Sequence, residues 1–169
     1  AFEVKEPNVM NRPPRKPDEA LFNGFVTFRV FFVSILMTVG TIVLFSWEYS
    51  YSLSTGMAQT DALARSQSIA VTFIIFFQIF YLINCRSLKE SVLKIGLFSN
   101  GFIFLGIGSI MLLQAMFLYT PFMQKVFGTA SLDGKGLFIS FVAGSLIFVV
   151  ISIEKWILRE LLNKKKKES

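Results

Sequence analysis

The sequence predicts an all-α membrane protein with four transmembrane helices and with both termini in the cytoplasm. The chain of 169 residues is 53% hydrophobic and only 17% charged, whereas soluble domains average about 25% charged residues. Four uncharged stretches are long enough for helices that cross a hydrocarbon core of about 30 Å. Basic residues also concentrate in alternate flanking segments, as the positive-inside rule requires.

The uncharged stretches define the expected helices. They lie at 30–47, 66–85, 95–124 and 136–153. Each is continuously apolar rather than alternating, and this pattern favours helices over strands. Asn100 and the pair Thr120-Pro121 shorten the third stretch. We therefore expect a bundle over 30–153, between a cytoplasmic lead-in at 1–29 and a basic tail at 157–169, with spans at about 26–47, 66–85, 100–120 and 136–156.

The flanking segments orient these spans. Lys and Arg are frequent in the lead-in, in the segment between the second and third spans, and in the tail. The other two connections carry only Arg65 in one and Lys125 and Lys135 in the other. The positive-inside rule places the rich side in the cytoplasm. The tail lysines Lys164, Lys165, Lys166 and Lys167 also suit anionic lipid, although topology alone explains them equally well.

Composition excludes several kinds of chemistry. Cys85 is the only cysteine and the chain has no histidine, so it can form neither a disulfide framework nor a histidine-dependent catalytic triad. We assign no catalytic residue and no metal site from these residue types. The net charge of +6 follows membrane topology, so we expect no nucleic-acid partner.

Small residues recur at helical spacing in two spans. Helices in lipid associate through such residues, because close backbone contact replaces the hydrophobic effect. We expect contact stripes at Gly101, Gly108 and Ala115 and at Gly136, Ser140 and Gly144. The alternative is that Gly and Ser are simply common in membrane spans. If the second stripe is a contact, Gly144→Leu weakens helix assembly.

Gln78 is the candidate cation ligand. It lies in the middle of the second span among aromatic and aliphatic residues, and its amide carries one acceptor oxygen and two N–H donors. A polar residue inside a membrane span is a functional hypothesis, and the alternative is an interhelical hydrogen bond. No span has a charged residue at its centre, which disfavours an independent channel or carrier.

The lead-in resembles a segment of the P-type cation-transporting ATPases, especially the calcium-pump branch. That segment reads Met-x-Arg/Lys-Pro-Pro-Arg, and the residues that match it here are Met10, Arg12, Pro13, Pro14, Arg15 and Pro17. Further similar stretches are Ala64-Arg65-Ser66, Asn84-Cys85-Arg86-Ser87 and Gly96-Leu97-Phe98-Ser99-Asn100. The resemblance covers essentially the whole chain in order.

This resemblance implies that the spans are helices seven to ten of a ten-helix pump. The segment Arg12-Pro13-Pro14-Arg15 would then belong to a loop that couples the membrane to the phosphorylation domain. Gln78 falls where sarcoplasmic-reticulum-type calcium pumps carry a Glu ligand. The transported ion implied is a cation, with Ca²⁺ expected.

The resemblance also implies partners that this chain does not contain. The phosphorylated Asp-Lys-Thr-Gly-Thr motif is absent and the first residue is Ala1, so we expect a fragment that is inactive alone. The parent pump would use ATP and Mg²⁺ and would reside in the plasma membrane. Its remaining helices, its cytoplasmic domains and the lipid bilayer are the expected partners. The alternative is a stand-alone four-span membrane protein with a structural or regulatory role.

Overall fold

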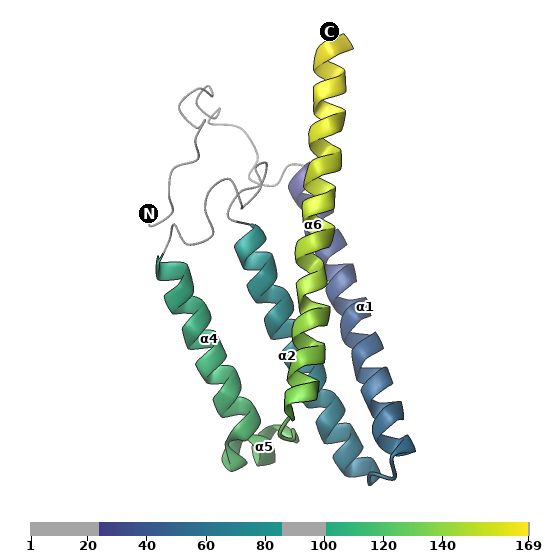
Figure 1. The fold of residues 1–169 in the computed structure, drawn as a ribbon, viewed down its shortest axis with the longest axis vertical. Helices are drawn as coiled ribbons and strands as arrows, with labels where there is room; N and C mark the ends of the chain where they lie inside the picture. The colour runs from purple at the N-terminus through teal and green to yellow at the C-terminus, as the bar shows by residue number, and fades with distance from the viewer. Residues whose placement is uncertain (1–23, 86–100, 169) are drawn as a thin grey trace.

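The computed structural model describes residues 24–85 and 101–168, and these residues form helices joined by short connections. In chain order the helices are α1 (Gly24–Ser54), α2 (Gln59–Asn84), α4 (Gly101–Tyr119), α5 (Pro121–Phe127) and α6 (Gly134–Glu168) (Figure 1). The described part contains no strand, so the all-α fold class is confirmed.

Four of the helices are long and apolar enough to cross a membrane, as the sequence predicts. Their membrane-compatible parts are Val26–Ser54, Gln59–Asn84, Gly101–Tyr119 and Gly134–Glu154. α1 begins, α2 ends and α4 begins at one end of the bundle, which we call the Arg29 end (Figure 1). The α1–α2 turn and α5 lie at the opposite end, which we call the Arg65 end. The cytoplasmic location of the Arg29 end stays a prediction from the charge distribution.

Three helices extend beyond the expected spans. α1 continues past residue 47 to Ser54, and α2 begins at Gln59 rather than near residue 66. The extensions carry Glu48 and Arg65, and the site below shows how these two charges are paired. α6 continues without interruption through the basic tail as far as Glu168.

Local sequence explains the turns at the Arg65 end. Gly56 has φ of +84° between α1 and α2, a left-handed conformation that costs glycine little. The short helix α5 begins at Pro121 and ends at Phe127, and its C-cap residue Gly128 is also left-handed. Proline suits the first turn because its missing N–H has no helical partner there. α5 thereby turns the chain from α4 toward α6.

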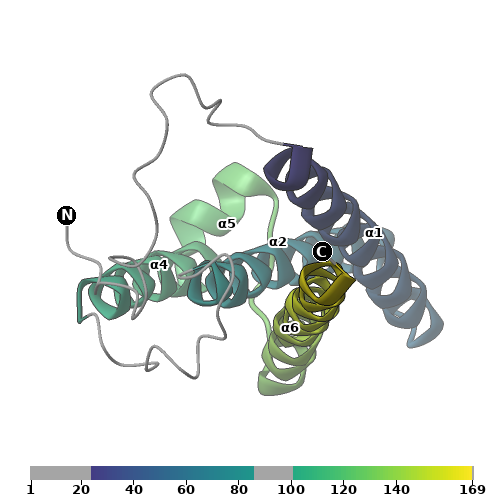
Figure 2. The ribbon, with the colours of Figure 1, turned by 90° about the horizontal axis from the view of Figure 1, so that it is seen from above.

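α2 is the central helix of the bundle. It packs against α1, α6 and α4, as Figure 2 shows from above. The main core cluster joins Phe73 and Phe77 of α2 to Val33 of α1 and to Ile147 and Ile151 of α6. A second cluster joins α2 to α4 and to the chain before α6. Contacts with the three other long helices therefore hold α2 in place.

α4 is the most loosely held of the four long helices. Its buried residues are Gln114 and Leu118, in the half nearer the Arg65 end. Large apolar side chains such as Leu105 and Leu112 are exposed. Such surfaces suit a lipid environment or neighbouring helices, and they exceed what a soluble monomer usually exposes.

Candidate functional site

Gln78 lies on an exposed side of α2. Its neighbours Phe77 and Ile79 are buried, whereas Gln78 itself is exposed. It borders a cavity of about 590 Å³ whose walls come from α1, α2 and α4. Ser34 of α1 and Ile110 of α4 line the same cavity. α2 therefore presents the Gln78 amide to a cavity that α1 and α4 also line, rather than to a closely packed helix contact.

The polar groups around this cavity could supply part of a cation site. The Ser34 hydroxyl donates to the carbonyl oxygen of Val30, 2.8 Å away, and its oxygen retains lone pairs that can accept. The Gln78 amide oxygen is a second neutral oxygen ligand. Among the described residues no group of three or more His, Cys, Asp or Glu is placed to hold a metal ion. Any cation site here therefore needs further ligands.

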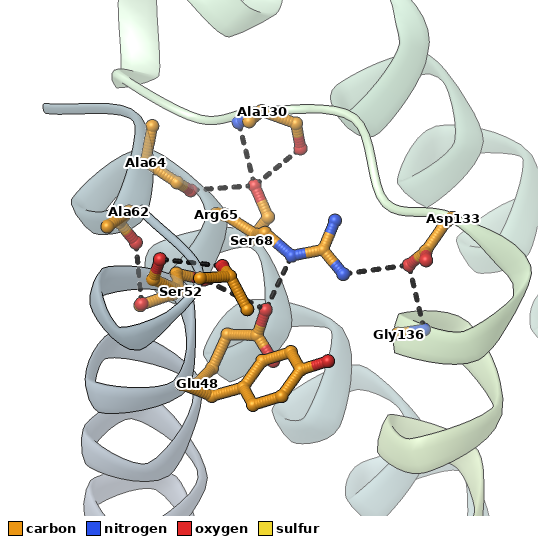
Figure 3. A network of polar contacts seen from close by, with 12 residues as sticks. Glu48, Ser52, Ala62, Ala64, Arg65, Ser68, Ala130, Asp133 and Gly136 are labelled. Atoms are coloured by element: carbon orange, nitrogen blue, oxygen red, sulfur yellow. Dashed lines mark hydrogen bonds and ion pairs between the residues drawn. The ribbon is translucent and has the colours of Figure 1, made fainter. Parts of the chain in front are cut away.

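An ion-pair network joins three segments at the Arg65 end (Figure 3). The Arg65 Nε donates to Glu48 Oε1 at 2.5 Å, and its Nη2 donates to Asp133 Oδ1 at 2.9 Å. Ser52 also donates to Glu48 Oε1, at 3.3 Å. The Glu48 side chain is only 2% exposed. Burying a carboxylate is costly unless it is paired and hydrogen-bonded, and these two donors allow α1 to carry Glu48.

Asp133 connects this network to the start of α6. Besides pairing with Arg65, its Oδ1 accepts a hydrogen bond from the backbone N–H of Gly136 at 3.0 Å. That hydrogen bond and the Arg65 guanidinium together hold the pKa of the Asp133 carboxyl below its usual range. The charged form of Asp133 is therefore the form that the fold stabilises.

Ser68 provides a neutral contact beside the ion pairs. Its hydroxyl donates to the Ala130 carbonyl oxygen at 2.6 Å and accepts from the Ala130 N–H at 2.8 Å (Figure 3). The segment between α5 and α6 is thus attached to α2 through the Ser68 hydrogen bonds as well as through the Arg65–Asp133 ion pair.

Polar contacts also join the helices toward the Arg29 end. Arg29 of α1, 3% exposed, donates to Glu154 of α6 at 2.5 Å. Asn84 of α2 donates to the carbonyl oxygen of Phe148 at 3.2 Å and lies 3.5 Å from the Ser152 hydroxyl. Together with the Arg65 network, these contacts anchor α2 between α1 and α6 near both of its ends.

Comparison with known proteins identifies the family. The family model described as "Cation transporting ATPase, C-terminus" matches residues 1–157. The chain belongs to this family. It is the C-terminal membrane part of a P-type cation ATPase of the calcium-pump-like kind, and it is an integral membrane protein with several spans.

Named relatives agree with the family match. The Mycobacterium tuberculosis "Probable cation-transporting ATPase F" is 36% identical over 151 residues, which are 89% of this chain and 16% of that protein. "Calcium-transporting ATPase 1" of Yarrowia lipolytica is 30% identical over 158 residues, 94% of this chain and 15% of its own length. Mouse "Calcium-transporting ATPase type 2C member 2" is 26% identical over 148 residues, which are 88% of this chain and 15% of that protein. This ATPase segment thus spans about 15–16% of these relatives.

The expected stripe on α6 lies partly against α2. A Cβ added at Gly144 would come 2.8 Å from the Cβ of Phe76 and 2.9 Å from the backbone nitrogen of Phe77. Ser140 is fully buried, and its hydroxyl lies 3.4 Å from the carbonyl oxygen of Ile69 on α2. Gly136 instead lies against Leu132 and Asp133, just before α6. Its backbone N–H donates to Asp133 Oδ1.

The expected stripe on α4 has no such neighbours. A Cβ added at Gly101 or Gly108 would meet nothing within 4 Å, and Ala115 is exposed. Within the described part of the ATPase segment, α4 contacts α2 through Gln114 and Leu118. Gln114 donates to the Thr72 hydroxyl at 2.9 Å, so the polar residue rather than the small ones marks the contact face.

The remaining two groups of predicted site residues belong to the lead-in and to the basic tail. Arg12, Pro13, Pro14 and Arg15 lie outside the described residues. Lys164, Lys165, Lys166 and Lys167 lie on the last turns of α6.

The ion pairs are not predicted by the sequence. There Arg65 counts as a basic connecting residue and as part of the family-like stretch Ala64-Arg65-Ser66, and Glu48, Asp133 and Glu154 have no predicted role. The sequence carries one signal for them: Glu48, Arg65 and Glu154 directly border apolar stretches and Asp133 lies three residues before one, and an unpaired charge is unfavourable there. The choice of partners needs the three-dimensional arrangement, because Arg65 and Asp133 are far apart in the chain.

Proposed function

We propose that this segment supports the ion-binding helices of an ATP-driven cation pump and supplies Gln78 to its ion pathway. The main support is the exposure of the Gln78 amide beside a cavity lined by α1, α2 and α4, on a helix that packs against α1 and α6. A mid-span amide beside an open cavity is costly in lipid. Neighbouring helices of the pump that bring further oxygen ligands would offset this cost.

Ca²⁺ is the proposed ion. Two of the relatives named above are called calcium-transporting ATPases. Ca²⁺ takes six to eight oxygen ligands, and amide oxygens are among those it accepts. Gln78 supplies one neutral oxygen, so most of the charge in such a site would come from helices outside this segment.

The remaining roles depend on the rest of the pump. We propose that Arg12-Pro13-Pro14-Arg15 couples the membrane helices to the cytoplasmic domains, because two consecutive prolines stiffen the backbone and hold the arginines at fixed positions. ATP and Mg²⁺ would act in those cytoplasmic domains. The plasma membrane is the proposed location, and the other pump helices, the cytoplasmic domains and lipid are the proposed partners.

The test is Gln78→Leu in the full-length ATPase that carries this segment. We expect a higher cation concentration for half-maximal ATPase activity, because one oxygen ligand is lost. Gln78→Glu should lower that concentration for Ca²⁺, since a carboxylate is a stronger ligand for a hard cation. Half-saturation is measured by titrating ATP hydrolysis with Ca²⁺.

Gln114→Leu is the matched control. It removes the same functional group from a buried interhelical hydrogen bond, so it should reduce thermal stability while half-saturation by Ca²⁺ stays unchanged. If Gln78→Leu and wild type have equal half-saturation, Gln78 is not a ligand and the proposed role fails.

A further inference from the structure

The part of α6 beyond Glu154 has no other helix beside it among the described residues. The membrane-compatible part of α6 ends at Glu154, whereas the helix itself continues to Glu168 (Figure 1). α2 ends at Asn84, whose side chain is bonded to α6 before Glu154 is reached. Leucines nevertheless continue past that point, at Leu158 and Leu161. Apolar residues outside the membrane favour a protein surface that removes them from water.

α1 and α6 run in opposite directions (Figure 1), and the contacts that join them follow one register. Three levels show this register, separated by four and then three residues on both helices, which is the spacing of positions on one helix face. From the core outward, these levels hold Leu36 with Ile147, Phe32 with Ile151, and Arg29 with Glu154. The first four of these residues belong to one core cluster or pack against it, and the last two form the ion pair.

The same register continues outward past the ion pair, again in steps of four and three residues. The next three levels hold Phe25 with Leu158, Phe22 with Leu161, and Asp18 with Lys165. Two apolar levels are thus followed by a level of opposite charges. Glu19 and Lys164 stand next to the charged level and repeat its complementarity. Phe25 belongs to α1, whereas residues 18 and 22 precede the described part of the chain.

We propose that residues 18–23 of the lead-in pack antiparallel on α6, along its face from Leu158 to Lys165. This contact would be continuous with the one that α1 and α6 make through Arg29 and Glu154. Residues 18–23 end where α1 begins, so no further chain is needed to bring them to α6. Their two carboxylates are also opposite in sign to the lysines at the same level of the register.

Charge distinguishes this occupant from the membrane surface. Anionic lipid attracts lysines but repels carboxylates, and Asp18 and Glu19 take the same level of the register as Lys164 and Lys165. A contact within the chain satisfies both signs at once. The occupant of this face of α6 is therefore the lead-in rather than lipid.

The contact would also matter for coupling. Residues 18–23 closely follow Arg12-Pro13-Pro14-Arg15, so the proposed coupling segment would be attached to the end of α6. That consequence rests on the proposed function, whereas the contact itself does not. The experiments below measure proximity and not transport, so failure of the contact and failure of the coupling role are distinguishable.

The first experiment treats the full-length ATPase that carries this segment with a water-soluble carbodiimide, which joins a carboxylate to an amine in direct contact. Peptide mass spectrometry identifies and quantifies each link. We expect links from Asp18 and Glu19 to the lysines at 164–167. The matched controls are Glu3 and Glu6, the other two carboxylates of the lead-in, which should form several-fold fewer links to the same lysines. Equal yields from all four carboxylates overturn the proposal, as does the absence of links from Asp18 and Glu19.

A pair of cysteines gives the second readout. Phe22→Cys combined with Leu161→Cys should form a disulfide under mild oxidation in air with copper phenanthroline, several-fold faster than Phe22→Cys combined with Asn163→Cys. Asn163 is two residues from Leu161, which is about 200° around the helix. Retained ATP hydrolysis shows that each variant is folded, and equal rates in the two folded variants overturn the proposal. The carbodiimide experiment needs no substitution, so it decides the question if a cysteine variant does not fold.

Discussion

At the scale of single residues, Gly144 shows how closely α6 approaches α2. The position where its Cβ would stand is already within 3 Å of Phe76 and Phe77, and one of those contacts is to backbone. Backbone cannot rotate away as a flexible side chain can, so even one methyl group requires the helices to separate. Gly108 is also in the middle of a span but has open space around it.

We therefore predict that Gly144→Ala destabilises the bundle by about 1–3 kcal/mol, the usual cost of overpacking, and that Gly144→Leu costs more. Thermal unfolding of the purified segment in detergent measures the effect. Gly108→Ala is the control and should be neutral or slightly stabilising, because alanine favours helix. Equal midpoints for Gly144→Ala and Gly108→Ala would contradict the close contact.

Asp133 gives a prediction about pH. Its pKa is lowered in the folded protein by the Gly136 N–H and by Arg65. Its contribution to stability is therefore complete above the ordinary aspartate pKa of about 3.9 and is lost as the pH falls through the lower folded value. The effect is modest because the side chain is 56% exposed.

Thermal midpoints of the segment between pH 7 and pH 3 test this dependence. Wild type should lose stability toward the acid end, and Asp133→Asn should lose less because its side chain does not titrate. Parallel curves for the two proteins would show that Asp133 does not contribute.

The two glutamines show what sequence alone could not predict. Gln78 and Gln114 both interrupt apolar spans, yet Gln114 bonds to Thr72 and Gln78 faces an open cavity. Whether a glutamine meets a neighbouring helix or a cavity depends on how its own helix is rotated about its axis. Spans that are apolar on all sides carry almost no periodic signal for that rotation.

At the scale of helices, the Arg65 network adds ion pairs to the hydrophobic packing at one end of the bundle. Arg65 of α2 holds Glu48 of α1 and Asp133 before α6 at the same time. Lys135 adds a cation–π contact with the Tyr51 ring, 5.1 Å from its centroid. The end of α1, the start of α2 and the start of α6 are thereby joined at the Arg65 end.

We predict that Arg65→Met destabilises the bundle by about 3 kcal/mol, because it leaves the buried Glu48 charge without its ion-pair partner. The double variant Arg65→Met with Glu48→Met should recover much of this loss, since no charge remains buried. Thermal unfolding of wild type, Arg65→Met, Glu48→Met and the double variant completes a double-mutant cycle. Additive losses would show that the pair is not coupled.

The network also explains why helix ends were harder to predict than helix centres. The uncharged stretches located all four spans, since length and hydrophobicity determine what can cross a membrane. They placed the end of the first span before Glu48 and the start of the second after Arg65. Each charge permits a longer helix because the other neutralises it, and that pairing is not visible in either stretch alone.

At the scale of the whole molecule, the bundle is organised around α2 rather than in chain order. α2 contacts α1, α4 and α6, and Gln78 lies exposed beside the cavity that α1 and α4 help to line. The sequence predicted the fold class and, through its resemblance to the P-type pumps, the family. It did not predict which helix is central, because nearly all surfaces of these spans are apolar.

We predict that the segment alone, reconstituted in vesicles, hydrolyses no ATP above the background of empty vesicles. The physical reason is that the sequence lacks the Asp-Lys-Thr-Gly-Thr motif that P-type pumps phosphorylate, and that in the described part no three His, Cys, Asp or Glu residues lie close enough to hold a metal ion. A phosphate-release assay with ATP and Mg²⁺ measures this directly, with the full-length pump as the positive control. Cation-dependent hydrolysis by the segment would refute the proposal that ATP acts only in the cytoplasmic domains of the pump.

The length of α6 has a mechanical consequence. From Glu154, where it is tied to Arg29, the helix runs on to Glu168, an arm of about 21 Å at 1.5 Å per residue. A rigid arm pivoting on that ion pair converts rotation into displacement: a tilt of about 10° moves its tip by roughly 4 Å. Small reorientations of the spans would thus be magnified at the lysine-rich end of the chain.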